Sequence, residues 1–218
     1  MPTRDIHEHE GDAAALVCER LAPELAGVTA RRITVGPPGP GELLVAVRAA
    51  ALNFPDLLMC EGRYQFKPPL PFVPGMEGSG VVLAVGEGVD PARVGQSVRF
   101  SNKGGALAER IRVPASQAWP TLARHDFAQS ASWHVGAITA YVGLVRAGSI
   151  RAGQSVLVHG GTGGMGYAAI QLARHLGATV YGTARDPSDR ERTAPLLAAG
   201  ARAIWPSAGF REPALEAT

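Results

Sequence analysis

Cysteine is scarce in this 218-residue chain: Cys18 and Cys60 are its only two, too few for a disulfide framework. An excess of one charge sign is also lacking. The chain has 21 Lys and Arg residues against 19 Asp and Glu residues, so the formal net charge is +2. With no basic excess to track phosphates, the sequence excludes a protein that binds nucleic acid by bulk electrostatics.

Long hydrophobic runs are missing too. No apolar run approaches the roughly 20 residues needed to span a bilayer. Residues 1–10 are polar and acidic where a signal peptide would be apolar. We therefore expect a cytoplasmic protein with no membrane partner and no nucleic-acid partner. Residues 1–12 are predicted to form a solvated tail. His7 and His9 flank Glu8 and could bind a metal weakly, but a mobile charged terminus is the preferred interpretation.

The chain does contain a 46% apolar fraction, which is enough for a hydrophobic core. Its 27 glycines and 17 prolines separate short apolar runs, a pattern that is typical of turns between strands or helices. Strands are predicted at residues 14–18, 31–35, 43–52, 80–86, 97–100 and 107–113. Several short strands at this spacing indicate a partly open β-barrel, and we assign residues 13–124 to it. One helix is predicted within this region, at residues 54–60. Asn53 stands at its N-cap and Pro55 falls in its first turn, where a missing N–H costs little.

After Pro120 the pattern becomes helical. Residues 126–146 are predicted to form a helical stretch with a break around residues 133–136. Alternating strands and helices follow, at residues 155–159, 164–175, 178–183, 188–199 and 201–205. This β-α-β-α-β order predicts an α/β domain with a parallel sheet and crossover helices. We place the domain boundary near residue 124 and assign residues 125–218 to the second domain.

The strongest motif is a glycine loop, Gly161-x-Gly163-x-x-Gly166. It follows a predicted strand and opens a predicted helix, which is the context that a dinucleotide-binding loop requires. The first glycine allows a tight turn, the second lets the backbone approach a pyrophosphate, and the third lets the helix pack against the strand. The predicted cofactor contacts here are Gly161, Gly163, Gly164, Met165 and Gly166. The alternative is a tight strand-to-helix turn with no ligand.

The residues at the end of the next predicted strand help to distinguish an NAD site from an NADPH site. An NAD site usually places an acidic residue there to bind the ribose 2′-OH. Here Thr183 and Ala184 are followed by Arg185, which can pair with a 2′-phosphate. Asp186 is the counter-evidence, since it could be a displaced ribose acceptor. We favour NADPH, with Thr183 and Arg185 as further contacts. The alternative for Arg185 is a surface arginine at a strand end.

Several motifs occur in a characteristic order: Arg48–Asp56, Glu61–Tyr64, Leu70–Val82, Val85–Val89, Ile138–Tyr141 and the glycine loop. Together they resemble the medium-chain dehydrogenase/reductase superfamily, and within it the zinc-independent quinone oxidoreductases and enoyl reductases. The resemblance implies an α/β architecture: a GroES-like β-barrel domain plus a partial doubly wound (Rossmann) dinucleotide-binding domain, with the active site between the two. Three predicted strands, against about six in a complete doubly wound domain, imply truncation at the C-terminus.

The resemblance also implies roles for individual residues. Zinc-using relatives carry ligands where this chain has Asn53 and Met76, neither of which is a credible zinc ligand. Tyr64 matches a proposed proton donor, and Asn53 an active-site asparagine that touches the nicotinamide end. Thr139 matches a cofactor-contacting threonine. The alternatives are an aromatic plug at a loop mouth for Tyr64 and a helix cap for Asn53.

Other residues are assigned roles outside the predicted catalytic and cofactor contacts. Phe66 and Lys67, in the segment after Tyr64, could meet an aromatic ring or an acidic head group. His134 and His159 are interpreted as core or strand-end residues rather than catalysts. Asp56 is interpreted as structural.

The resulting hypothesis is an NADPH-dependent oxidoreductase. It would transfer hydride, without zinc, to a quinone or an α,β-unsaturated carbonyl or enoyl compound. Its partner is then a small-molecule substrate, and a homo-oligomer is left open because relatives are often dimers. The alternative is a truncated, non-catalytic dinucleotide-binding or interaction module.

Overall fold

The computed structural model describes residues 11–217, so the predicted histidine pair at His7 and His9 lies outside the described residues. Gly11 and Asp12, which we assigned to the tail, instead begin the first strand. The chain divides into two compact units between His134 and Val135, later than the expected boundary near residue 124.

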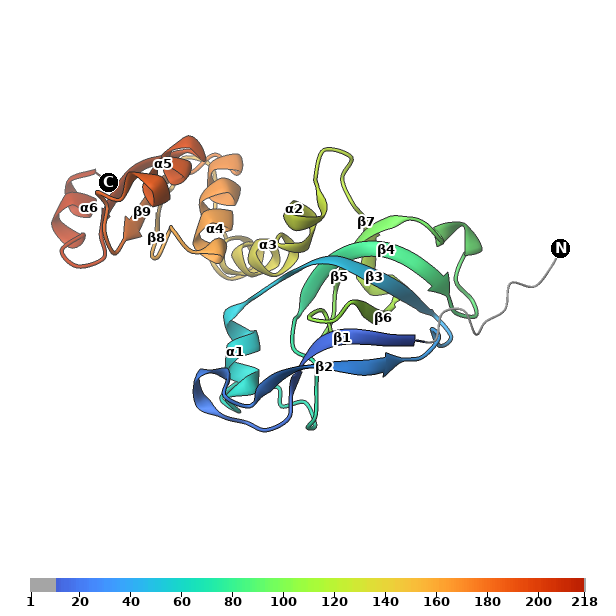
Figure 1. The fold of residues 1–218 in the computed structure, drawn as a ribbon. Coiled ribbons are helices and arrows are strands. Elements are labelled where there is room, and N and C mark those ends of the chain that lie inside the picture. The colour runs from blue at the N-terminus through green and yellow to red at the C-terminus, as the bar shows by residue number, and fades with distance from the viewer. Residues whose placement is uncertain (1–10, 218) are drawn as a thin grey trace. The chain divides into compact units, whose positions relative to one another are not determined.

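The N-terminal unit is built on antiparallel strands (Figure 1). Its main sheet has the order β6-β3-β4-β5-β7, with a two-stranded β1-β2 sheet beside it. The strands are β1 (Gly11–Cys18), β2 (Val28–Val35), β3 (Glu42–Ala51), β4 (Glu77–Val85), β5 (Ser97–Ser101), β6 (Arg110–Pro114) and β7 (Ala118–Pro120). Isolated bridges join Ala15 to Ala108 and Cys18 to Phe72. Short 3₁₀ turns lie at Pro23–Leu25, Pro91–Arg93 and Ala115–Gln117.

The predicted strands of this unit are confirmed, although β1, β2 and β4 each begin three residues earlier than expected and two further details differ. The strand expected from residue 107 begins only at Arg110. The backbone N–H of Leu107 donates to the Pro74 carbonyl, and that of Glu109 donates to the Ala14 carbonyl. These residues therefore bond to the segment before β4 and to β1 instead of extending β6. The short strand β7 was not predicted, because three residues carry no periodicity that sequence reasoning can detect.

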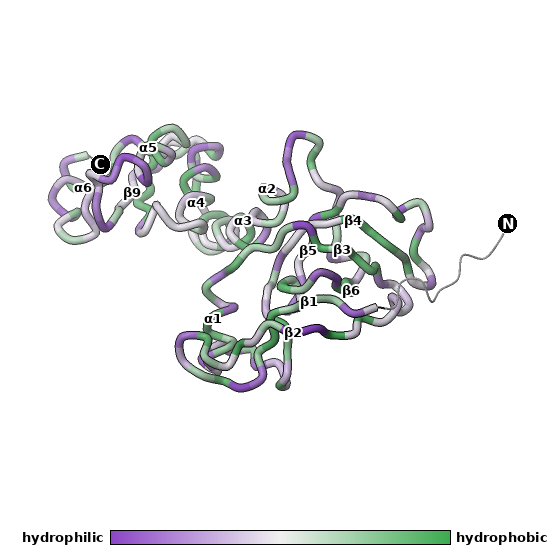
Figure 2. Tube along the Cα trace, in the orientation of Figure 1, coloured by the Kyte–Doolittle hydropathy of each residue, from purple (hydrophilic) through white to green (hydrophobic). Residues whose placement is uncertain are grey.

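The core of this unit lies on one face of the main sheet. Its fully buried side chains include Leu43, Val45, Val82, Val98, Phe100 and Val113. Burial of each such side chain contributes about 1.5–3 kcal/mol. Figure 2 shows how hydropathy differs between strands: β3 and β4 are largely hydrophobic, whereas part of β2 is hydrophilic. That hydrophilic part contains the exposed pair Arg31 and Arg32.

Two short helices complete the N-terminal unit. The first, α1 (Phe54–Cys60), has the bounds that the sequence predicted. The second, α2 (Phe127–Ala131), begins with a capping box in which Asp126 Oδ1 accepts from the Gln129 N–H at 2.7 Å. The Ser79 hydroxyl of β4 donates to the carbonyl of Phe127, which fastens α2 to the barrel sheet. This attachment explains why the unit extends beyond residue 124.

The C-terminal unit contains the parallel sheet that the sequence predicted, with the strand order β10-β9-β8. Its strands are β8 (Ser155–Val158), β9 (Thr179–Ala184) and β10 (Ala201–Pro206). Its helices are α4 (Gly164–His175), α5 (Arg190–Ala198) and α6 (Arg211–Ala217), preceded by α3 (His134–Tyr141) and a π-helical stretch, Val142–Ala147. The predicted bounds of α4 are confirmed, whereas α6 was not predicted.

Helix α4 packs on the sheet through one face. Ala169, Ile170 and Ala173 are buried against β8 and β9, at the spacing that places residues on one side of a helix. The helix ends at His175, and Gly177 follows with a positive φ of 83°, a conformation that glycine adopts without strain. The packing therefore fixes the N-terminus of α4, and with it the glycine loop, relative to the sheet.

Candidate functional site

Asn53 lies at the junction between β3 and α1, in extended backbone conformation just before the helix. Its side-chain Nδ2 donates to Glu77 Oε1 at 2.9 Å, and its backbone N–H donates to Asp56 Oδ2 at 2.8 Å. Asp56 Oδ1 accepts a second hydrogen bond, from the Gly75 N–H at 3.0 Å. The Asn53 amide is therefore oriented by a carboxylate from β4, while Asp56 ties the start of α1 to the segment that leads into β4.

Two carboxylates are buried beside Asn53, with Asp56 only 3% and Glu77 only 1% exposed. Burial raises the pKa of Asp56, more than the N–H donors of Asn53 and Gly75 lower it, and the charge of Glu77 raises that pKa further. Asp56 acts structurally here, as the sequence suggested. Sequence reasoning missed Glu77. The signal that could have found it is an acidic residue at the start of a strand that otherwise reads as buried.

Tyr64 lies just beyond the other end of α1. The backbone N–H groups of Arg63 and Tyr64 both donate to the carbonyl of Leu58, at 2.8 and 3.2 Å, which fixes the chain as it leaves the helix. The Tyr64 side chain is half-buried, and its hydroxyl makes no hydrogen bond within residues 11–217. Asn53 and Tyr64 thus lie before and after a seven-residue helix, which is about 10 Å long.

A cluster of rings surrounds Arg99 of β5. Its guanidinium carbon lies 5.2 Å from the ring centroid of Trp119 and 4.7 Å from that of Trp133. His134 stacks on Trp119, with centroids 4.9 Å apart. Burial, and then the charge of Arg99, lower the pKa of His134 despite the opposing charge of Glu77. These effects favour the uncharged imidazole, which packs as an aromatic ring against Trp119.

The glycine loop connects β8 to α4 and is held by backbone hydrogen bonds. The Gly161 N–H donates to the Thr183 carbonyl at 2.9 Å, and the Gly163 N–H donates to the Gly160 carbonyl at 3.0 Å. The positive φ of the turn, 64°, belongs to Gly160. We expected Gly161 to allow the tight turn, so Gly160 is a residue that the motif did not reveal.

Gly166 allows α4 to approach the loop closely. A Cβ at this position would lie 2.4 Å from the Gly160 carbonyl oxygen and 2.9 Å from the Gly161 Cα, closer than real Cβ atoms come. This is the packing role expected for the third glycine. A Cβ at Gly164 would meet nothing within 4 Å, and the Met165 side chain is 51% exposed. The start of α4 therefore presents open space.

Thr183 lies behind the loop, at the end of β9, and is fully buried. Its hydroxyl accepts from the Gly160 N–H at 3.2 Å and lies 3.3 Å from His159 Nδ1. The ring of His159 meets that of Phe210 edge to face, with centroids 4.6 Å apart. Thr183 thus holds the loop in place, and His159 is a strand-end residue, as expected.

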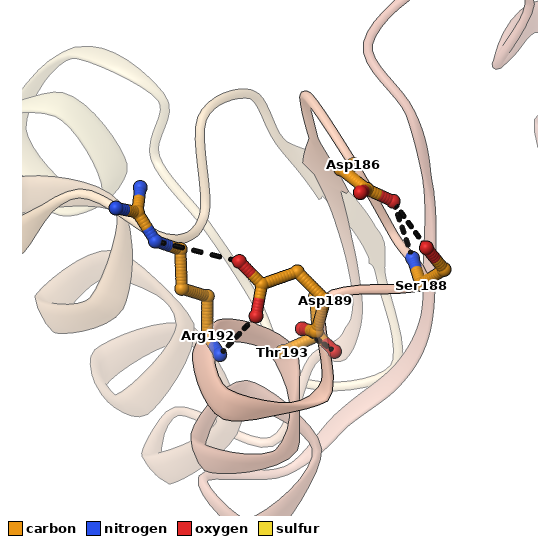
Figure 3. Close-up of polar contacts among 5 residues, drawn as sticks. All are labelled: Asp186, Ser188, Asp189, Arg192 and Thr193. Atoms are coloured by element: carbon orange, nitrogen blue, oxygen red, sulfur yellow. Dashed lines mark hydrogen bonds and ion pairs between the residues drawn. The ribbon is translucent and has the colours of Figure 1, made fainter.

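The segment after β9 carries the charges that sequence reasoning singled out. Arg185 is exposed and has no hydrogen-bond or ion-pair partner within residues 11–217. Asp186 Oδ1 accepts from both the N–H (2.9 Å) and the hydroxyl (2.6 Å) of Ser188, and these bonds lower its pKa. Asp189 accepts from the Arg192 N–H at 3.2 Å and pairs with its guanidinium at 3.5 Å (Figure 3). Arg185 is therefore available to an anion.

Thr139, the remaining predicted cofactor contact, lies on α3 and is exposed. Its hydroxyl donates to the carbonyl of Val135 at 2.7 Å, so only its acceptor lone pairs face outward. Over residues 11–217, no three His, Cys, Asp or Glu side chains form a group that could hold a metal. The described helices are also too short or too polar for any of them to cross a membrane.

Comparison with known proteins gives a consistent set of relatives. The family model described as "Alcohol dehydrogenase GroES-like domain" matches residues 39–123. The mouse synaptic vesicle membrane protein VAT-1 homolog is 47% identical over 148 residues, which cover 67% of this chain and 36% of that protein. The chain thus spans only about a third of this relative's length.

Two solved structures are similar over most of the chain. A probable oxidoreductase from Mycobacterium abscessus superposes with a TM-score of 0.84 at 35% identity, covering 95% of this chain and 66% of that one. The quinone oxidoreductase from Thermus thermophilus, whose structures include a complex with NADPH, superposes with a TM-score of 0.78 at 34% identity. That match covers 93% of this chain and 63% of the Thermus chain.

Proposed function

Because the chain belongs to the medium-chain dehydrogenase/reductase superfamily, we propose that it is an NADPH-dependent oxidoreductase that acts without zinc. Its substrate is a quinone or an α,β-unsaturated carbonyl or enoyl compound. The observation that carries this proposal is the pairing of two features in the C-terminal unit: the open glycine loop before α4 and the unpaired Arg185 after β9.

The glycine loop fits the diphosphate of a dinucleotide. The N–H groups of Gly164, Met165 and Gly166 lie in the first turn of α4, where a helix has no preceding carbonyl for them. These groups and the positive end of the helix dipole face an anion bound there. Gly164 leaves room for it, since a Cβ would meet no atom within 4 Å. Bound NADPH supplies a hydride.

Arg185 supports NADPH rather than NADH. Its guanidinium can pair with a 2′-phosphate in a charge-assisted hydrogen bond, a contact that NADH cannot make. Asp186, which could accept from a ribose 2′-OH, already has one oxygen bonded twice by Ser188. Arg192 forms an ion pair with Asp189, so it is a weaker candidate than Arg185 for binding the 2′-phosphate.

On the substrate side, Tyr64 and Asn53 have separate tasks. The Tyr64 hydroxyl, which has no partner within residues 11–217, donates a proton to the reduced substrate. The Asn53 amide is held by Glu77 through one N–H, which leaves its second N–H to donate to a bound carbonyl group. An amide at position 53 and a thioether at Met76 do not form a zinc site, so an oxyanion relies on these donors instead.

Two separate measurements test the proposal: substrate-dependent oxidation of NADPH, and the affinity of the chain for NADPH and NADH. The purified chain is mixed with NADPH and either 1,4-benzoquinone or crotonyl-CoA, and the loss of NADPH absorbance is followed. NADPH and NADH affinities are measured by fluorescence titration. We expect substrate-dependent NADPH oxidation and tighter binding of NADPH than of NADH. A folded chain that binds NADPH but turns over neither substrate would instead be a non-catalytic dinucleotide-binding module.

A further inference from the structure

Lysine is concentrated at one place in this protein. Of the 21 basic residues other than histidine, only Lys67 and Lys103 are lysines, and they lie 36 positions apart in sequence. Both flank Phe66. Lys67 follows it in the chain, and the Lys103 ammonium lies 5.6 Å from the centre of its ring. All three side chains are exposed, Phe66 at 40%. We call these three residues the lysine–phenylalanine patch.

The backbone under Lys103 is fixed against the segment that leads into β4. The Asn102 N–H donates to the Met76 carbonyl and the Gly105 N–H donates to the Val73 carbonyl, both at 2.8 Å. Gly105 has a positive φ of 97°, and a Cβ at Gly104 would lie 3.0 Å from the Val73 carbonyl oxygen. These contacts hold the turn against residues 73–76, and the Lys103 ammonium lies over a ring only two residues from Tyr64.

The positive charge of the patch is not cancelled by its own segments. Residues 63–76 and 99–108 contain no Asp or Glu. Arg63 pairs with Glu61 at 3.0 Å, so the nearest carboxylate in sequence is already engaged by a cation. The carboxylate of Glu109, just beyond the second segment, accepts from the Ala14 N–H at 2.9 Å. An anion that approaches Phe66 therefore meets the Lys103 ammonium and an aromatic ring, and the exposed Lys67 is the next residue in the chain.

We infer that the lysine–phenylalanine patch makes this protein prefer substrates that carry an acidic group on a planar, conjugated body. The inference rests on the proposed function and names its substrate class. The flat body stacks on Phe66 while the carboxylate, sulfonate or phosphate pairs with Lys67 and Lys103. Exposed ion pairs are individually weak, so each lysine contributes a preference of about two- to five-fold.

The test compares two substrates with the same reacting group, trans-cinnamaldehyde and 4-carboxycinnamaldehyde. The readout is the ratio of their kcat/KM values, carboxylated over neutral, at low salt. We expect a ratio above one in the wild type. Lys103→Gln and Lys67→Gln each lower it about two- to five-fold, and Lys103→Arg retains it. Arg202→Gln, which removes an exposed cation from the other unit, leaves it unchanged.

The ratio separates recognition from structural damage, because a variant that merely loosens the fold lowers both kcat/KM values together. Salt provides a second check, since screening lowers the wild-type ratio toward one. A wild-type ratio of one, or a ratio that both glutamine variants leave unchanged, overturns the inference.

Recognition can also be tested without turnover, which separates failure of the inference from failure of the proposed function. Binding of 2-naphthoate and its neutral isostere 2-naphthamide is measured by ligand-observed NMR. Tighter binding of 2-naphthoate, lost in Lys103→Gln, supports the inference even if no substrate is reduced. Equal binding of the two probes overturns it even in an active enzyme.

Discussion

The side-chain amide of Asn53 donates a 2.9 Å hydrogen bond to the carboxylate of Glu77, a residue that is only 1% exposed. This contact joins the start of α1 to the start of β4, two segments that are 24 residues apart in sequence. A buried carboxylate is costly unless donors surround it, so the amide is both oriented by Glu77 and stabilising for it. Asn53 occupies the N-cap position, yet its side chain serves this buried contact.

Replacement of Asn53 tests that contact. Asn53→Ala removes a donor to a buried carboxylate and is expected to lower the free energy of unfolding by about 1–3 kcal/mol. Asn53→Asp places a third carboxylate beside Asp56 and Glu77. It is expected to be more destabilising at pH 7 and to recover stability as the pH falls and one carboxylate takes up a proton.

Urea-induced unfolding at pH 7 and pH 5 measures both effects. Leu52→Ala, at a neighbouring side chain that is 75% exposed, is the control and is expected to change the stability by less than about 0.5 kcal/mol. An Asn53→Ala variant as stable as this control would show that the hydrogen bond contributes nothing.

Arg185→Ala tests the choice of cofactor. Loss of a charge-assisted hydrogen bond at an exposed site is expected to weaken NADPH binding about tenfold and to leave NADH binding unchanged. Arg202→Ala, an exposed arginine of the following strand, is the matched control. Fluorescence titration with both nucleotides measures the effect. Equal affinity of wild type and Arg185→Ala for NADPH would show that Arg185 does not bind the 2′-phosphate. It would not contradict the proposal that the glycine loop binds a dinucleotide.

Gly166→Ala tests the approach of α4 to its loop. The added Cβ would lie 2.4 Å from the Gly160 carbonyl oxygen, which is backbone and cannot rotate away. We expect a loss of about 1–3 kcal/mol in stability and a loss of NADPH binding, because the loop must shift. Gly143→Ala is the control. A Cβ at that helical position meets nothing within 4 Å, so the change should be neutral or stabilising by up to about 1 kcal/mol.

The parts of this fold that follow local rules could be predicted from the sequence. Helix α4 was predicted with its observed bounds, because glycines precede it, basic residues fill its last turn and its apolar residues repeat at helical spacing. The parallel sheet followed from the alternation of strands and helices. Helix α6 was missed, since its seven residues include Pro213 and too few apolar positions to show a period.

Side-chain partners that are distant in sequence could not be predicted. Glu77 reaches Asn53, Lys103 reaches Phe66, and the Thr183 hydroxyl reaches Gly160 only because the strands bring them together. Thr183 was predicted as a cofactor contact from its place at the end of the second strand of the C-terminal unit. The structure gives its hydroxyl a partner in the loop, and its contact with the cofactor stays a prediction, as do those of Thr139 and Arg185.

The two cysteines give a prediction about alkaline pH. Cys18 and Cys60 are both buried, and the Cys18 thiol donates to the backbone carbonyl of Cys60 at 4.0 Å. Burial, followed by the neighbouring Cys18, raises the pKa of the Cys60 thiol to about 12, above its ordinary value of 9.0. Between these two values the unfolded chain ionises this thiol and the folded chain does not, so stability contributed by Cys60 is lost as the pH rises from about 9 to about 12.

Comparison with Cys60→Ala isolates that contribution from the other groups that titrate in alkali. The urea midpoint of the wild type is expected to fall more steeply between pH 8 and pH 10.5 than that of the variant, which has no thiol at position 60 to ionise. The same burial makes both thiols of the folded protein slow to react with Ellman's reagent at pH 8, while both react at once in urea. Parallel slopes for the two proteins, together with rapid labelling of the folded chain, would show that Cys60 is accessible and ionises normally.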